Sequence, residues 1–165
     1  MDKGRVQVIC GEGHGKTAMA LGKAVTEVTS GRKVIMIQFL KGVLSTATAE
    51  GLKHLEPDLK VFRFEKQQDL FENLTEEQKQ EELLNIRNGL NFARKVLTTG
   101  ECDMLILDEF LGILDQKIIS EEELKNFFAL REETVDLVLT GKVCPPQLEE
   151  YADLVIRIEN VKVDK

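Results

Sequence analysis

Two short runs in this sequence are apolar at every position, "MLIL" at residues 104–107 and "LVL" at residues 137–139. A strand of this kind must be covered on both faces, as in a parallel sheet flanked by helices. The two belong to a set of short runs, rich in β-branched residues, that alternate with amphipathic segments. These runs span residues 5–10, 33–39, 59–64, 103–107, 135–140 and 154–158. The sequence therefore predicts an α/β fold with a mostly parallel sheet of about six strands.

The segments between the runs carry signals for helix ends. Thr75 is followed three positions later by Gln78, and Ser120 by Glu123. This is the spacing of a capping box at the start of a helix. Residues 41–50, "KGVLSTATAE", show no strong period, so we expect a loop or a short mobile helix there.

Length and charge narrow the class of protein. A chain of 165 residues suits a single domain. Its net charge of −7 argues against broad contact with nucleic acid, which needs a basic surface. We expect a cytoplasmic protein without a membrane span, because the sequence has neither a long apolar stretch nor the core of a signal peptide. Cys10, Cys102 and Cys144 are widely separated, so we expect reduced thiols rather than disulfides or a zinc site.

The stretch "GEGHGKT" at residues 11–17 directly follows the first apolar run and precedes a helical run. Strand, glycine turn and helix are the context of a phosphate-binding loop, in which glycines let successive backbone N–H groups face a phosphate. Lys16 adds a mobile positive charge, and the Thr17 hydroxyl is placed to bind Mg²⁺. The alternative is a strand-to-helix turn that merely happens to be rich in glycine. Cys10 stands where the usual signature has its first glycine.

The stretch "CDMLILDEF" at residues 102–110 contains an apolar run followed by two adjacent acids. In phosphate-loop proteins a carboxylate at the end of a buried strand reaches the Mg²⁺ shell opposite the loop threonine. We expect Asp108 near the metal's water shell, and Glu109 either on the metal or orienting a reactant. A plainer alternative is that these acids cap the following helix. Together the two stretches predict a phosphate-loop nucleotide-binding domain over residues 1–165, built as a three-layer sandwich.

Four blocks carry a resemblance to a known family. They are "GEGHGKTAMALG" at 11–22, "IQFLKG" at 37–42, "LILDE" at 105–109 and "LTGKVCPPQLEEYADLV" at 139–155. In this order they are similar to blocks of the corrinoid adenosyltransferases of cobalamin biosynthesis. Members of that family typically show G-N-G-K-G-K-T-T, Q-F-x-K-G, L-D-E and T-G-R-x-x-P-x-x-L-x-x-x-A-D. Such a loop normally has no glycine at the position of Cys10, so the absence of glycine there is typical of the family.

The resemblance implies a particular reaction. The 5′-deoxyadenosyl group of ATP would pass to the Co(I) of a reduced corrinoid, cob(I)yrinic acid a,c-diamide or cob(I)alamin, and triphosphate would leave. ATP with Mg²⁺ and the corrinoid would be the ligands. A homodimer that receives electrons from a partner reductase is also implied.

Site residues carry over from the resemblance by position. Lys16 and Glu109 would be catalytic, and Thr17, Asp108 and Glu109 would serve the metal. The residues expected to bind the nucleotide are Gly11, Glu12, Gly13, His14, Gly15, Lys16, Thr17, Ala18, Gln38 and Lys41. For Lys41, an ordinary exposed lysine is an equal alternative.

Several departures from the family pattern bear on activity. His14 replaces a lysine, Ala18 replaces the second threonine of the loop, and Lys142 stands where T-G-R has arginine. The chain has no tryptophan, whereas relatives carry a G-F-T-W-like segment after the third strand, and it ends at "IENVKVDK" where relatives continue. The residues expected to bind the nucleotide are therefore better preserved than those expected to bind the corrinoid.

Two other functions remain open on the sequence. One is a phosphate-loop ATPase or kinase-like enzyme that acts on another acceptor, with Glu109 positioning water or a hydroxyl. The other is a homologue that binds ATP without turnover.

Overall fold

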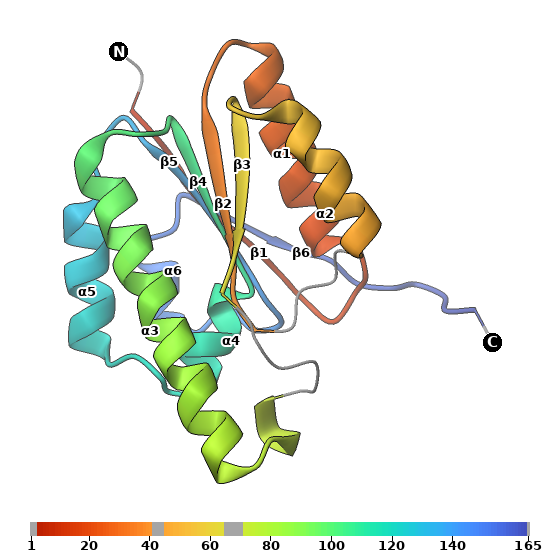
Figure 1. Cartoon of the computed structure of the whole chain (residues 1–165), viewed down its shortest axis with the longest axis vertical. Helices are drawn as coiled ribbons and strands as arrows, with labels where there is room; N and C mark the ends of the chain where they lie inside the picture. Colours follow the sequence, from red (N-terminus) through yellow and green to blue (C-terminus); the bar gives the residue numbers. More distant parts are fainter. Residues whose placement is uncertain (1–2, 41–44, 65–70, 165) are drawn as a thin grey trace.

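The computed structural model describes residues 3–40, 45–64 and 71–164, and a sheet of six strands runs through it (Figure 1). The strands are β1 Val6–Cys10, β2 Val34–Gln38, β3 Leu59–Arg63, β4 Met104–Asp108, β5 Asp136–Thr140 and β6 Leu154–Arg157. They lie in the order β3-β2-β4-β5-β1-β6, and every neighbouring pair is parallel. The predicted α/β fold is confirmed, and each strand ends within one residue of the run predicted for it.

The helices fall between the strands. Those in the described residues are α1 Lys16–Thr29, α2 Thr46–Leu52, α3 Glu76–Thr99, α4 Phe110–Asp115, α5 Glu121–Leu130 and α6 Pro146–Glu149, with 3₁₀ turns at Lys53–Leu55 and Phe71–Asn73. Helix α2 occupies part of the segment predicted as a loop or short helix, and residues 41–44 lie outside the described residues. Its N-cap is Ser45, whose side chain accepts a hydrogen bond from the N–H of Thr48.

Both predicted capping boxes are present. The hydroxyl of Thr75 accepts from the N–H of Gln78 at the start of α3, and the hydroxyl of Ser120 accepts from the N–H of Glu123 at the start of α5. The side chains of Gln78 and Glu123 bond back to the N–H groups of Thr75 and Ser120. These bonds satisfy N–H groups that have no partner inside the helix.

Helices cover both faces of the sheet, which explains why its central strands are apolar at every position. In β4, Leu105 and Leu107 pack into the core shared with α3, α4 and α5. The alternate residues Met104 and Ile106 pack into a second core with Ala20 of α1. Figure 1 shows the same division, with α1 and α2 on one side of the sheet and α3, α4 and α5 on the other. The fold is therefore the three-layer arrangement predicted from the sequence.

The strand order fixes where a ligand can bind. The chain leaves β1 for α1 on one face of the sheet, whereas it leaves β4 and β5 for α4 and α6, which pack on the other face. Neighbouring connections that run to opposite faces leave a crevice at the carboxyl ends of the strands, where open α/β sheets bind ligands. The loop after β1 opens at this point.

One carboxylate joins helices α3 and α5. Glu123 pairs with Arg87 of α3, and Arg94 lies 3.6 Å from the same carboxylate. The hydrogen bond from Arg87 is the main cause that holds the pKa of Glu123 below its ordinary value of 4.5. A carboxyl group with a lower pKa in the folded state stabilises that state at neutral pH, and this contribution is lost as the pH falls through the folded-state pKa.

The variant Glu123→Gln removes this charge and keeps a capping box, because glutamine also serves at that position. We expect its free energy of unfolding at pH 7 to lie below that of the wild type by up to about 1 kcal/mol, the range of partly exposed ion pairs. The difference should shrink as the pH falls below 4.5. Urea unfolding measured across this range tests the prediction, with the exposed neighbour Glu122→Gln as control. A difference that stays constant with pH would contradict it.

Candidate functional site

The phosphate loop leads into a helix whose first turn has no cap. Gly15 is the N-cap residue of α1, it has a φ of 102°, and no side chain caps the helix. Serine or threonine caps α2, α3 and α5, so α1 differs from these three helices. No described residue accepts from the N–H groups of Gly15, Lys16, Thr17 or Ala18. N–H groups left without a protein partner at the positive end of a helix dipole can bind an anion.

Lys16 lies inside the loop. Its ammonium nitrogen Nζ donates hydrogen bonds to the carbonyl oxygens of Gly11 and Gly13, both at 2.8 Å. The charge is therefore held against the backbone of the first part of the loop. A phosphate bound there would meet both the lysine and the helix N-terminus.

Asp108 is the centre of a buried hydrogen-bond network. It lies at the end of β4 and is fully buried. Its carboxylate accepts from the hydroxyl of Thr17 at 3.0 and 3.1 Å and from the hydroxyl of Thr140 at 2.7 Å. The side-chain amide of Gln38 donates to it at 3.1 Å, and the Oε1 of Gln38 in turn accepts from Nε of Arg63 at 2.9 Å. The structure thus brings together three residues predicted from the sequence, Thr17, Asp108 and Gln38.

Thr140 is a member of this network that the sequence analysis did not assign. It is fully buried at the end of β5, and its hydroxyl also accepts from the N–H of Glu109 at 3.0 Å. The available signal was its place directly after the apolar run "LVL", at the same sheet edge as Asp108.

Glu109 is held in an unusual backbone conformation beside Asp108. It has a φ of 62°, in the left-handed region that few non-glycine residues adopt. Although it is the N-cap residue of α4, its side chain does not cap that helix. Burial, together with the negative charge of Asp108, raises the pKa of Glu109, and the charges of Lys16 and Lys142 oppose this. The side chain is therefore free for another task, close to the lysine of the loop.

The outer side of the loop is bound to the segments that follow β5 and β6. The N–H of Gly11 donates to the carbonyl oxygen of Lys142 at 2.8 Å, and the N–H of Gly13 donates to that of Ile158 at 2.9 Å. The N–H of His14 donates to Oδ1 of Asn160 at 3.1 Å. Three N–H groups in the first part of the loop are therefore bonded to the protein, whereas those of residues 15–18 have no acceptor among the described residues.

Two of the loop glycines are also required by close packing. A Cβ atom at Gly11 would lie 2.3 Å from the carbonyl oxygen of Ile158, and one at Gly13 would lie 2.7 Å from the same oxygen. Real Cβ atoms do not approach backbone atoms this closely. The sequence predicts a role for these glycines in phosphate binding, and the structure adds a steric reason for them.

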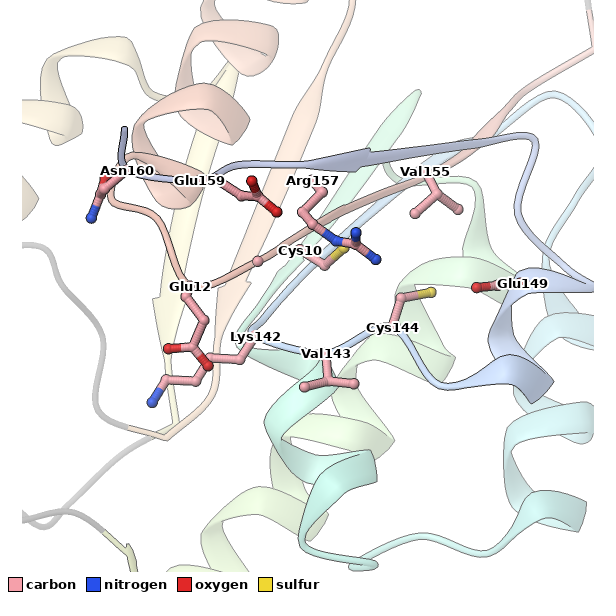
Figure 2. A pocket seen from close by; sticks show the side chains of 11 residues that line it. Cys10, Glu12, Lys142, Val143, Cys144, Glu149, Val155, Arg157, Glu159 and Asn160 are labelled. Atoms are coloured by element: carbon pink, nitrogen blue, oxygen red, sulfur yellow. The ribbon is translucent and has the colours of Figure 1, made fainter. Parts of the chain in front are cut away.

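A cavity of about 770 Å³ lies beside the loop, as Figure 2 shows. Its walls come from the start of the loop, the segment after β5, helix α6, and β6 with the residues that follow it. Its charged residues are Glu12, Lys142, Glu149, Arg157 and Glu159. Cys10 lines the cavity and also belongs to the core shared with α3 and α5. The cavity therefore opens on the sheet face opposite α1.

The remaining predicted residues lie at the surface or outside the described part. Glu12, His14 and Ala18 are exposed, and Lys41 falls outside the described residues. Phe64, near the end of β3, packs against the core with its ring centroid 5.8 Å from that of Phe92.

All three cysteines are free thiols, as expected. Burial raises the pKa of Cys102 to about 12 and that of Cys144 to about 11, so both stay protonated at neutral pH. In the described residues no helix is both long enough and apolar enough to cross a membrane.

A solved structure has a similar fold. The KaiC-like protein PH0186 of Pyrococcus horikoshii OT3 superposes with a TM-score of 0.62, covering 99% of this chain and 77% of that chain. At 16% sequence identity this similarity concerns the fold alone.

Sequence comparison is more specific. The corrinoid adenosyltransferases of Escherichia coli K12 and of a Sinorhizobium species are 26% and 27% identical to this chain; each match covers 98% of it, and 79% and 74% of the relative. CobA, the corrinoid adenosyltransferase of Salmonella typhimurium, is 25% identical with the same coverage as the E. coli protein. The sequence model of ATP:corrinoid adenosyltransferases BtuR/CobO/CobP matches residues 2–164. From its loop at β1 to the strand β6, the chain thus belongs to the ATP:corrinoid adenosyltransferase family.

Proposed function

We propose that this protein transfers the 5′-deoxyadenosyl group of ATP to the Co(I) of a reduced corrinoid and releases triphosphate. The observation that carries the proposal is the uncapped N-terminus of α1, with Lys16 held in the loop and the buried Asp108 beside it. Membership of the family supplies the class of reaction. Cob(I)alamin and cob(I)yrinic acid a,c-diamide are the proposed acceptors.

In this reaction the protein stabilises a leaving group. When cobalt attacks the 5′ carbon of the ribose, the C5′–O bond breaks and negative charge grows on the triphosphate. The N–H groups of residues 15–18 and the ammonium of Lys16 would face that charge, and they are already oriented before the substrate binds. No water needs activation, so the remaining task is to hold C5′ in line with the cobalt.

Mg²⁺ is the proposed metal cofactor, and the residues present fit it. The Thr17 hydroxyl and the Asp108 carboxylate are hard oxygen ligands that already lie 3.0 Å apart. In the described part of the chain, the hydrogen-bond partners of Asp108 are Thr17, Thr140 and Gln38, and none of them is basic. Thr17 and Asp108 would hold the ion, with Glu109 next to them. When bound, Mg²⁺ would neutralise part of the charge on the triphosphate.

Glu109 has a proposed role as an orienting group near the reacting atoms. Its raised pKa and its freedom from capping leave it able to donate or accept a hydrogen bond there. The same position suits a residue that orients water in an ATPase, which makes ATP hydrolysis the second candidate function. The products distinguish the two, because adenosyl transfer releases tripolyphosphate whereas hydrolysis releases ADP and phosphate.

The domain organisation, cellular location and assembly of the enzyme are proposed from the resemblance and the fold. We propose that residues 1–165 act as one nucleotide-binding domain, because the described strands share one sheet. A cytoplasmic homodimer that receives electrons from a reductase accords with the resemblance to the family. Lys41 is retained as a proposed nucleotide contact.

The variant Lys16→Ala tests the proposed site. With Mg-ATP and chemically reduced cob(I)alamin, we expect kcat/KM to fall by at least about 100-fold, because a preorganised charge at the leaving group is lost. The spectral change on formation of the cobalt–carbon bond gives the rate, and tripolyphosphate is measured in the same samples. Lys125→Ala, which changes an exposed lysine on α5, serves as control. Wild-type protein that forms no adenosylated product and releases only ADP would overturn the transferase proposal.

A pair of variants at Thr17 tests the proposed metal site. Thr17→Ser keeps the hydroxyl, whereas Thr17→Val keeps the shape and removes it. We expect the Mg²⁺ concentration for half-maximal activity to rise about tenfold or more in Thr17→Val and to change little in Thr17→Ser. Titration of activity with Mg²⁺ at fixed ATP provides the measurement. Equal Mg²⁺ dependence in both variants would show that the hydroxyl does not serve the metal.

A further inference from the structure

The segment after β6 is fastened to the phosphate loop by main-chain and side-chain bonds. Ile158 continues the pairing of β6 with β1, since its N–H donates to the carbonyl oxygen of Cys10 at 2.8 Å. Its own carbonyl oxygen accepts from the N–H of Gly13 at 2.9 Å. Two residues further on, Asn160 contacts His14 through both ends of its amide group. Figure 2 shows Asn160 on this segment, among the residues that line the cavity at the loop.

The amide of Asn160 fixes the position of the proton on the ring of His14. The backbone N–H of His14 can only donate, so the Asn160 atom 3.1 Å from it is the oxygen Oδ1. The other end of the amide, Nδ2, can only donate, and it lies 2.8 Å from Nδ1 of the His14 ring. That ring nitrogen must therefore accept. The neutral ring consequently carries its proton on Nε2.

We propose that Asn160 is a positioning residue for triphosphate binding and that it acts through His14. By holding the N–H of His14 on the outer side of the loop, Asn160 sets the turn that leaves the N–H groups of residues 15–18 unpaired. Preorganisation of a loop raises affinity because less conformational freedom is lost on binding. The proposal rests on one part of the proposed function, namely that the loop binds the triphosphate of ATP.

The same contact gives residue 14 a defined chemical character. The orientation of the His14 ring is set by Asn160, and in its neutral form the ring donates through Nε2. His14 and Asn160 are both exposed, so burial does not hold them in place. Their two hydrogen bonds are what fixes the ring.

The first experiment reads the tautomer. Nitrogen-15 NMR at alkaline pH should show His14 with the proton on Nε2 in the wild type, and His54, the other of the two histidines, is an internal reference. In Asn160→Asp the carboxylate still accepts from the backbone N–H of His14 but has no donor for the ring. We expect that variant to lose the preference for Nε2 protonation. A wild-type ring protonated on Nδ1, or an unchanged tautomer in Asn160→Asp, would overturn the assignment.

The second experiment measures affinity, with inorganic tripolyphosphate and Mg-ATP as calorimetric probes. We expect Asn160→Ala to raise both dissociation constants about three- to tenfold, the effect of one net hydrogen bond, and to leave kcat at saturating ATP unchanged. The double variant His14→Ala/Asn160→Ala should weaken binding by less than the sum of the two single effects, because the two residues act as a unit, and an additive loss would contradict this. Asn126→Ala, at an exposed position on α5, is the control.

The outcomes separate the two proposals. If the wild type binds neither probe, the proposed function fails whatever Asn160 does. If the wild type binds and Asn160→Ala binds equally well, Asn160 does not position the loop. Tighter binding by Asn160→Ala would also overturn the inference, because Asn160 would then compete with phosphate for the N–H of His14.

Discussion

The carboxylate of Asp108 is the point on which the site depends. It is buried at the end of β4, where an unsatisfied charge would be strongly unfavourable, and it is satisfied by donors from α1, β2 and β5. The bond from Thr17 attaches the first turn of α1 to the central strand. Since the phosphate loop joins β1 to that turn, its position follows from this attachment. The network therefore aligns the helix N-terminus before any ligand is bound.

The loop is held from two sides by different kinds of bond. On the inside, the charged side chain of Lys16 bonds to carbonyl oxygens of the loop, and these bonds can be exchanged for bonds to phosphate. On the outside, neutral bonds to Lys142, Ile158 and Asn160 fix the backbone of residues 11–14. A ligand can thus replace the inner bonds while the outer ones keep the loop in shape.

Much of the fold and part of the site could be predicted from the sequence, because their signals are local. The cap at Ser120 depends on residues three apart, whereas Gln38, which is 70 residues from Asp108, was predicted only from the resemblance of its block to the family. Thr140 and Asn160 were missed because their partners are 32 and 146 residues away. Thr140 had a weak signal in its place after a buried run. Asn160 had none, because nothing near it in the sequence indicates that it contacts the loop.

The close approach of Ile158 to Gly11 and Gly13 bears on whether these glycines indicate the use of ATP in a relative. Because the steric requirement comes from the chain after β6, it persists in a homologue that has lost the use of ATP. Such a protein would still display the glycine pattern in an alignment. Lys16 carries no comparable packing constraint, so its loss or retention is the better sign of whether a family member is still an enzyme.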